Sequence, residues 1–166
     1  LSAAKREGRP IAVLHLLCHG GQVESTFGLV LDGEPGQPGS IAVDAGRLRQ
    51  VLGQHADMVR LVVLMACDSG NTGRIGNQLG SVAQTLHRAG IAAVVASRYP
   101  LSVAGSIRTT QSLYTTLLVG LDSQESALLS ARNELAKDAT HRDWASVQLY
   151  ARDADGADSR PIVFRP

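Results

Sequence analysis

Two short stretches of the sequence each end an apolar run with a side chain that can take part in nucleophilic catalysis. The first, "PIAVLHLLCHGG" at residues 10–21, ends in Cys18, His19 and two glycines. The second, "VVLMACDSG" at residues 62–70, carries Cys67 directly after its apolar run. A thiol nucleophile needs a nearby imidazole that exchanges protons, and N–H groups that stabilise the developing oxyanion. We therefore predict that His19 and Cys67 form a catalytic pair.

Side chains of the first stretch alternate between two faces, because successive residues of a strand point in opposite directions. His15, Leu17 and His19 are expected on one face, and Cys18 on the other. We expect Cys18 to be a structural thiol, and His15 to be a packed core histidine or a support for His19. Cys67 differs, because a cysteine where a strand enters a turn lies near free backbone N–H groups, which favour the thiolate.

Apolar runs and amphipathic segments must position these two residues. The runs predict strands, and segments with an apolar period of 3.6 residues predict helices. Strands that alternate with helices are typical of an α/β fold with a mostly parallel sheet, whose functional groups lie beyond the carboxyl ends of the strands. We expect strands at 10–18, 27–32, 58–66, 91–97, 146–152 and 161–165, and helices at 44–54, 77–89, 102–120 and 123–139.

The same patterns predict helix caps and inward-facing side chains. Asp44 is the expected N-cap of the helix at 44–54, and Asp122 with Glu125 forms a D-x-x-E capping box for the helix at 123–139. The side chains expected to face the core are Leu48, Val51 and Leu52 in the first of these helices, and Ile107, Tyr114, Leu118 and Leu121 in the helix at 102–120.

The composition excludes several classes of function. The chain has 166 residues, enough for one domain, with 44% hydrophobic residues, 4% aromatic residues and a formal net charge of +1. Without a Lys/Arg block, no nucleic-acid partner is expected. The histidines and cysteines show no ligand spacing, so no metal or cofactor is expected.

Two cysteines favour a reducing, cytoplasmic compartment over a disulfide framework. No apolar run is long enough for a membrane span, so no membrane partner is expected. The sequence begins "LSAAKREGRP", without an initiator methionine, and we expect a piece of a longer protein.

Together, the two stretches resemble the paired motifs of a known peptidase clan. "HLLCHGG" followed by "VVLMACDSG" is similar to the His-Gly and A-C-x-S-G motifs of caspase-like cysteine peptidases. Within that clan the sequence is most similar to CHAT domains, relatives of caspases and separases that occur beside sensor or repeat domains. "GIAAVVASRYPLSVAGS", "SLYTTLLVG", "SQESALLSARNEL" and "DWASVQLYARDADG" resemble later segments of that family, so the resemblance covers about residues 10–156.

This resemblance implies a caspase-like three-layer α/β fold, with a mostly parallel central sheet flanked by helices, in a single domain over residues 1–166. It implies peptide-bond hydrolysis by a Cys–His dyad, with Cys67 as nucleophile and His19 as proton-transfer partner. The N–H groups of Gly20 and Cys67 would form the oxyanion hole. The implied partners are a protein or peptide substrate and a regulatory sensor domain or subunit, with antiviral defence in bacteria as the context and self-association left open.

The substrate-binding residues depart from the family pattern. Related peptidases place a polar or charged residue two positions before the cysteine, where this chain has Met65, and "RYPLSVAG" lacks the acid of separase-like members. The family also has strands before the catalytic histidine that this chain lacks. If Asp68 lines the pocket, basic residues are expected before the scissile bond (position P1), and otherwise small or neutral ones. The candidate substrate-binding residues are Met65, Asp68, Arg98 and Tyr99, and the nearest candidate acids are Asp68 and Asp32.

Two other functions stay open. "SGNTGRIG" at residues 69–76 follows a buried strand and precedes a helix, and its spacing of Gly70, Gly73 and Gly76 resembles a loop that binds a nucleotide or flavin phosphate. Arg98 would then suit a 2′-phosphate. The other alternative is a non-catalytic interaction module on the same fold.

Overall fold

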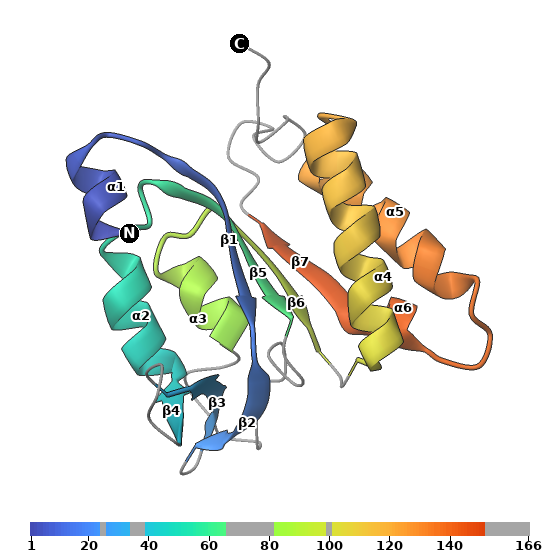
Figure 1. Ribbon diagram of the computed structural model, residues 1–166, viewed down its shortest axis with the longest axis horizontal. Coiled ribbons are helices and arrows are strands. Elements are labelled where there is room, and N and C mark those ends of the chain that lie inside the picture. The colour runs from blue at the N-terminus through green and yellow to red at the C-terminus, as the bar shows by residue number, and fades with distance from the viewer. Residues whose placement is uncertain (24–25, 34–38, 66–81, 99–100, 152–166) are drawn as a thin grey trace.

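The computed structural model describes residues 1–23, 26–33, 39–65, 82–98 and 101–151, which form two sheets and their covering helices (Figure 1). The central sheet has the strand order β1-β5-β6-β7, and a smaller sheet has the order β2-β3-β4. The strands are β1 (Ile11–Leu17), β2 (His19–Val23), β3 (Thr26–Asp32), β4 (Ser40–Asp44), β5 (Val59–Met65), β6 (Ala93–Ser97) and β7 (Val147–Ala151). The helices are α1 (Ser2–Arg6), α2 (Ala45–Gly53), α3 (Val82–Arg88), α4 (Val103–Tyr114), α5 (Gln124–Ala136) and α6 (Asp143–Ser146), with the π-helical turn η1 (Thr115–Val119) continuing α4.

The central sheet is mostly parallel, as the sequence predicts. β1, β5 and β6 run in one direction, and β7 is antiparallel to β6. Every residue of β5 except Arg60 is buried, and so is all of β6. Continuous apolar runs of this kind belong to strands that are covered on both faces.

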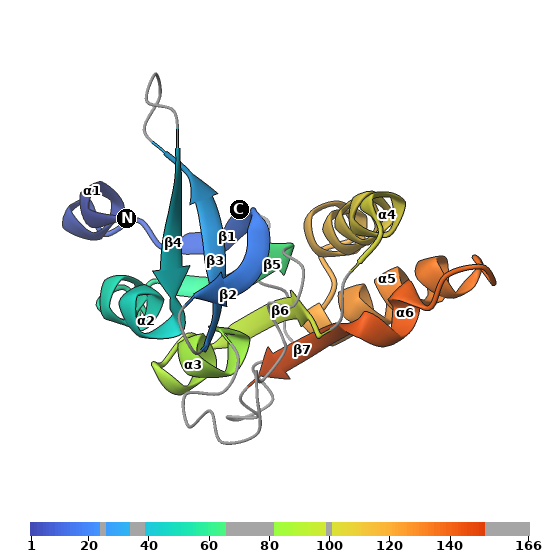
Figure 2. The ribbon, with the colours of Figure 1, turned by 90° about the horizontal axis from the view of Figure 1, so that it is seen from below.

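Helices cover the two faces of this sheet and enclose two separate cores. On one face α2 and α3 contribute Leu48, Leu52 and Leu86 to the first core. On the other, η1 and α5 contribute Leu117 and Ala127 to the second. Figure 2 shows α2 and α3 on one side and α4 with α5 on the other. The predicted three-layer α/β architecture is confirmed.

The smaller sheet is antiparallel and begins where β1 ends. β2 pairs with β3, which pairs with β4. Gly28 lies in the middle strand, where a Cβ would come within 2.5 Å of the Val43 carbonyl oxygen and 2.7 Å of Val23 Cγ2. Glycine is therefore required for this close approach of strands, and the sheet depends on it.

Helix capping follows the sequence at one position and differs at another. Asp44 caps α2 by accepting a hydrogen bond from the Arg47 N–H at 2.9 Å, as predicted. The predicted capping box at Asp122 is wrong, because the N-cap of α5 is Ser123, whose hydroxyl accepts from the Ser126 N–H at 3.1 Å. Asp122 instead accepts a hydrogen bond from the Ser123 N–H.

The expected inward stripes of two helices need correction. Val51 in α2 is exposed, although Leu48 and Leu52 are buried as predicted. In the helix over 103–119, Ile107 and Leu118 are exposed, and the buried positions are Gly105, Thr109, Leu113 and Leu117. Gly105 and Thr109 are small and let the helix approach its neighbours closely, so the larger apolar side chains do not all face the core.

Several elements were missed or lie outside the described residues. β2, β4 and α1 were not predicted. For β2 the reason is its two glycines, a residue type that is depleted in strands. The predicted strand at 161–165 and residues 77–81 of the predicted helix at 77–89 lie outside the described residues. None of the helices in the described part of the chain has the length and apolarity needed to cross a bilayer.

Candidate active site

β1 and β5 end at the same level of the central sheet. Leu17, the last residue of β1, is paired in parallel register with Met65, the last residue of β5. His19 follows Leu17 by two residues, and in the sequence Cys67 follows Met65 by two residues. Outside the described residues lie Cys67, Asp68, Tyr99 and the phosphate-loop candidate at 69–76.

His19 is the first residue of β2, at the point where the chain passes from the central sheet to the smaller one. Its partner in the antiparallel register is Val30 of β3, and the next residue, Gly20, lies opposite Leu29. The His19 side chain is exposed to solvent. Pairing with β3 thus fixes the backbone of the candidate proton-transfer residue, while its imidazole stays accessible to a substrate.

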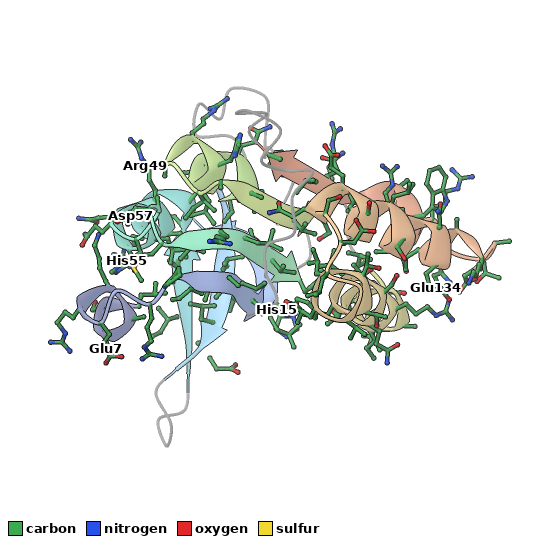
Figure 3. The ribbon with its side chains drawn as sticks, turned by 90° about the horizontal axis from the view of Figure 1, so that it is seen from above. Glu7, His15, Arg49, His55, Asp57 and Glu134 are labelled. Atoms are coloured by element: carbon green, nitrogen blue, oxygen red, sulfur yellow. The ribbon has the colours of Figure 1, made fainter. Side chains whose placement is uncertain are left out.

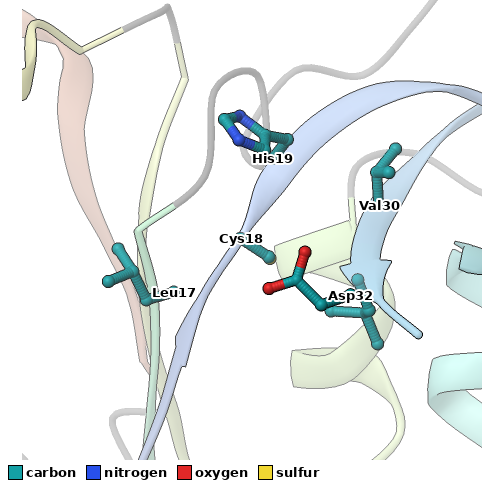
Figure 4. Close-up of a pocket in the computed structure, with 6 residues that line it drawn as sticks. Leu17, Cys18, His19, Val30 and Asp32 are labelled. Atoms are coloured by element: carbon teal, nitrogen blue, oxygen red, sulfur yellow. The ribbon is translucent and has the colours of Figure 1, made fainter. Parts of the chain in front are cut away.

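A small hollow of about 220 Å³ lies on the β3 side of His19. Figure 4 shows Cys18 and Asp32 on the same side of the β1 ribbon, with Leu17 on the opposite side. Asp32, a candidate acid from the sequence, is exposed here. The hollow is lined by Leu17, Cys18, His19, Val30, Leu31 and Asp32.

A larger, apolar cavity of about 530 Å³ lies on the α4 side of His19. Met65 lines it, so the residue two positions before Cys67 faces the same space as His19. Two side chains at this cavity, Leu17 and Val103, are 78% and 79% exposed. The full lining is His15, Leu17, Cys18, His19, Met65, Leu101, Val103, Ser106, Ile107, Thr110 and Gln111.

Comparison with known families identifies the chain. The CHAT domain family matches residues 1–152. The chain belongs to the CHAT domain family. This family is related to the caspase-like cysteine peptidases, in agreement with the three-layer α/β fold. No curated protein matches the chain.

Cys18 and His15, which lie close to His19 in the sequence, have different surroundings in this CHAT domain. Cys18 is half-buried, and packs against the first core with Leu14 and Leu16. Burial raises the pKa of the Cys18 thiol, which keeps it in the unreactive form. His15 faces the other way, toward α4 (Figure 3), so the predicted alternation of these two side chains is confirmed.

His15 forms a neutral pair with Tyr114 at the end of α4. Its Nδ1 and the Tyr114 hydroxyl are joined by a hydrogen bond of 2.9 Å, and the ring centroids are 5.6 Å apart. Burial lowers the pKa of His15 and raises the pKa of Tyr114, so both groups are uncharged near neutral pH. Among the described residues, none is a hydrogen-bond partner for the buried His15 Nε2.

Arg98 is not among the described residues that line the apolar cavity. It follows β6 with an exposed side chain, and its backbone N–H donates to the Ser146 carbonyl at 2.8 Å. The structure therefore brings together His19 and Met65 of the predicted site, and leaves Arg98 outside that group.

Sequence reasoning missed the residues that hold the α4 wall of the cavity. Ser102, the N-cap of α4, accepts from the Gly105 N–H at 2.8 Å and donates to Asp143 Oδ2 at 2.6 Å. Asp143 is buried at the start of α6, and a Cβ on Gly105 would lie only 2.0 Å from its carboxylate. Ser102 in "PLSVAG" is a recognisable cap signal, but nothing in the sequence links it to Asp143, 41 residues later.

Proposed function

We propose that this CHAT domain is a cysteine endopeptidase that cleaves peptide bonds with a dyad of Cys67 and His19. The observation that carries the proposal is the pairing of Leu17 with Met65 at the carboxyl edge of the sheet. Neighbouring strands lie about 4.8 Å apart, and two residues of chain reach about 7 Å. This register supports the proposal, because residues that follow Leu17 and Met65 by two positions leave the same edge of the sheet from neighbouring strands.

The first half of the proposed reaction forms an acyl-enzyme. The Cys67 thiolate attacks the carbonyl carbon of the scissile bond, and the carbonyl electrons move onto the oxygen, which the N–H groups of Gly20 and Cys67 stabilise. The protonated imidazole of His19 then gives its proton to the amide nitrogen. The C–N bond breaks, the amine leaves, and a thioester to Cys67 remains.

Hydrolysis of the thioester completes the cycle. His19, now neutral, takes a proton from a water molecule as the water oxygen attacks the thioester carbon. The C–S bond breaks, the carboxylic acid product leaves, and the thiolate and imidazolium return. The exposure of the His19 side chain supports both steps, because substrate and water must each reach the imidazole.

Cys18 does not serve as the nucleophile in this proposal, although it is adjacent to His19. It packs against the first core, and burial raises its thiol pKa. A thiol with a raised pKa is protonated at neutral pH and reacts slowly.

The family resemblance extends the proposal to regulation and context. CHAT domains occur beside sensor or repeat domains, so we propose that an attached sensor domain or partner subunit activates this one in the reducing cytoplasm. Antiviral defence in bacteria is the biological role proposed on the same ground. Because such a partner would activate the domain, cleavage is tested on the full-length protein as well as on this domain.

The test is cleavage of a mixed peptide library, followed by mass spectrometry, with wild type, Cys67→Ala and Cys18→Ala. Loss of the nucleophile should lower the cleavage rate by at least about 10³-fold, whereas Cys18→Ala should retain it. Thermal unfolding shows that each variant is folded. Cleavage by a folded Cys67→Ala variant, or no cleavage by the wild type, would contradict the proposal, and the latter would favour the interaction module.

A further inference from the structure

We propose that the apolar cavity between β1, β5 and α4 receives the P1 side chain of the substrate, and that it selects a long, uncharged, apolar residue such as Leu, Met or Phe. This inference rests on the proposed peptidase function, and adds the class of substrate that the site accepts. Of the two alternatives that the sequence leaves open at P1, a basic residue or a small or neutral one, it favours a neutral residue and specifies a long one.

The position of the cavity assigns it to P1. Its lining includes His19 and Met65, which precedes Cys67 by two residues. The carbonyl that Cys67 attacks belongs to the P1 residue, so this carbonyl must lie against the dyad. The P1 side chain branches from the Cα next to that carbonyl and is the part of the substrate that reaches the cavity most directly.

The walls of the cavity are apolar and partly exposed. Leu17 and Val103 are the two most exposed of the large hydrophobic side chains in the described part of the chain, and Ile107 beside them is 53% exposed. Exposed apolar side chains that gather around one opening mark a binding site, because binding removes them from water. This surface comes from a strand and a helix: Leu17 belongs to β1, and Val103 and Ile107 belong to α4.

The size of the cavity fits a large side chain. A volume of about 530 Å³ lies within the range of small-molecule pockets, which is about 300–1,000 Å³. The cavity therefore admits Leu, Met or Phe, each of which covers more of its apolar wall than an alanine or serine side chain does. On α4, Ser106, Thr110 and Gln111 add uncharged hydrogen-bonding groups, which can contact the substrate backbone.

The described lining residues oppose an ionised P1 side chain, because their only charge in the proposed reaction is the dyad imidazolium of His19. No Asp, Glu, Lys or Arg lies among them. The His15 end of the cavity is neutral too, because burial lowers the pKa of His15 and Tyr114 satisfies its Nδ1. A buried Lys or Arg side chain of the substrate would find no carboxylate among these residues. A buried Asp side chain could pair only with the His19 imidazolium, which the proposed reaction needs as its proton donor. Both conditions oppose entry of a charged side chain.

The experiment compares kcat/KM for internally quenched peptides that differ only at P1, with Leu, Met, Ala, Asp or Lys. Leu and Met peptides should be cleaved about 10- to 100-fold faster than Ala, Asp or Lys peptides. Ile107→Asp places a carboxylate at the cavity from an exposed helical position, so it should fold normally. It should lower the Leu rate by about tenfold and raise the Lys rate.

Leu129→Asp is the matched control. Leu129 is 60% exposed on α5 and does not line the apolar cavity, so its substitution should leave the P1 preference unchanged. Binding of the Leu and Lys peptides to Cys67→Ala, measured by calorimetry, gives a second readout that does not need catalysis. The Leu peptide should bind more tightly, and adding Ile107→Asp should remove that difference.

The outcomes separate the two proposals. A wild type that prefers Lys, Asp or Ala at P1 would overturn the cavity assignment and leave the peptidase function intact. Selective binding of the Leu peptide, lost in the Ile107→Asp background, without cleavage of any peptide, would support the cavity and overturn the peptidase function. Absence of both cleavage and selective binding would overturn both.

Discussion

The two sides of His19 present a substrate with very different surfaces. On the β3 side, the small hollow of about 220 Å³ has the exposed carboxylate of Asp32 and the half-buried Cys18. On the α4 side, the apolar cavity of about 530 Å³ has Met65, Val103 and other uncharged residues. The same three residues, 17–19, contribute to both spaces.

The difference follows from the change of sheet at residue 18. Leu17 ends β1 in the central sheet, and His19 begins β2 in the smaller one. The side of β1 with Cys18 therefore meets β3, while the side with His15 meets α4. The imidazole of His19 thus lies between a hollow that carries one carboxylate and a cavity whose described lining has none, so substitutions on the two sides should have unequal effects.

The largest expected effect comes from His19 itself. His19→Ala should lower kcat/KM by about 10²- to 10⁴-fold, the usual contribution of general acid–base catalysis. In the Cys67→Ala background it should cause little further loss, since the dyad acts as a unit. Asp32→Asn, in the small hollow, should change kcat/KM less than about threefold, because an exposed carboxylate interacts weakly with its neighbours.

A multiplicative loss in the His19→Ala, Cys67→Ala double variant would mean that the two residues act independently. A loss in Asp32→Asn as large as that in His19→Ala would instead make Asp32 a third catalytic residue and place the chemistry on the β3 side.

A smaller effect is expected from Asp143, which holds the α4 wall. Asp143→Ala removes the carboxylate that accepts a hydrogen bond from the Ser102 hydroxyl at 2.6 Å. The free energy of unfolding should fall by about 1–3 kcal/mol, the cost of leaving a buried polar group without its partner. KM for a peptide with Leu at P1 should rise more than kcat falls, because Leu101 and Val103 flank Ser102 and line the cavity.

Urea unfolding and steady-state kinetics of Asp143→Ala measure these two effects. Glu7→Ala is a suitable control. Glu7 forms an ion pair with Arg9 in which both side chains are exposed, and such pairs contribute little to the free energy of unfolding. Unchanged stability in Asp143→Ala would show that the Ser102 cap does not depend on this carboxylate.

The smallest predicted effect is a pH dependence of stability from His15. Burial lowers its pKa in the folded state below the ordinary value of 6.5. As pH falls through 6.5, the unfolded chain binds a proton that folded His15 resists, so the free energy of unfolding decreases. His15→Gln should lose this part of the decline below pH 6.5. An identical pH profile in wild type and His15→Gln would contradict the assignment.

Local patterns predicted the fold more fully than they predicted the site. The apolar runs of β5 and β6 and the Asp44 cap are local signals, and each was found where the sequence indicates. The strand at His19 was missed, because a Gly-Gly pair opposes strand formation until pairing with β3 stabilises it.

The apolar cavity could not be predicted for a similar reason. Its walls combine Leu17, Met65 and Ile107, which only tertiary packing brings together. The helix pattern moreover assigned Ile107 to the core, whereas close approach at Gly105 and Thr109 turns it toward the cavity.

Covalent labelling with a peptide chloromethyl ketone that carries Leu at P1, followed by peptide mapping, tests the Cys67–His19 dyad and the apolar cavity together. Cys67 and not Cys18 should be alkylated in the folded protein, and labelling should be slower in both His19→Ala and Ile107→Asp. Alkylation of Cys18 at an equal rate, or labelling of Cys67 that neither substitution slows, would contradict these assignments.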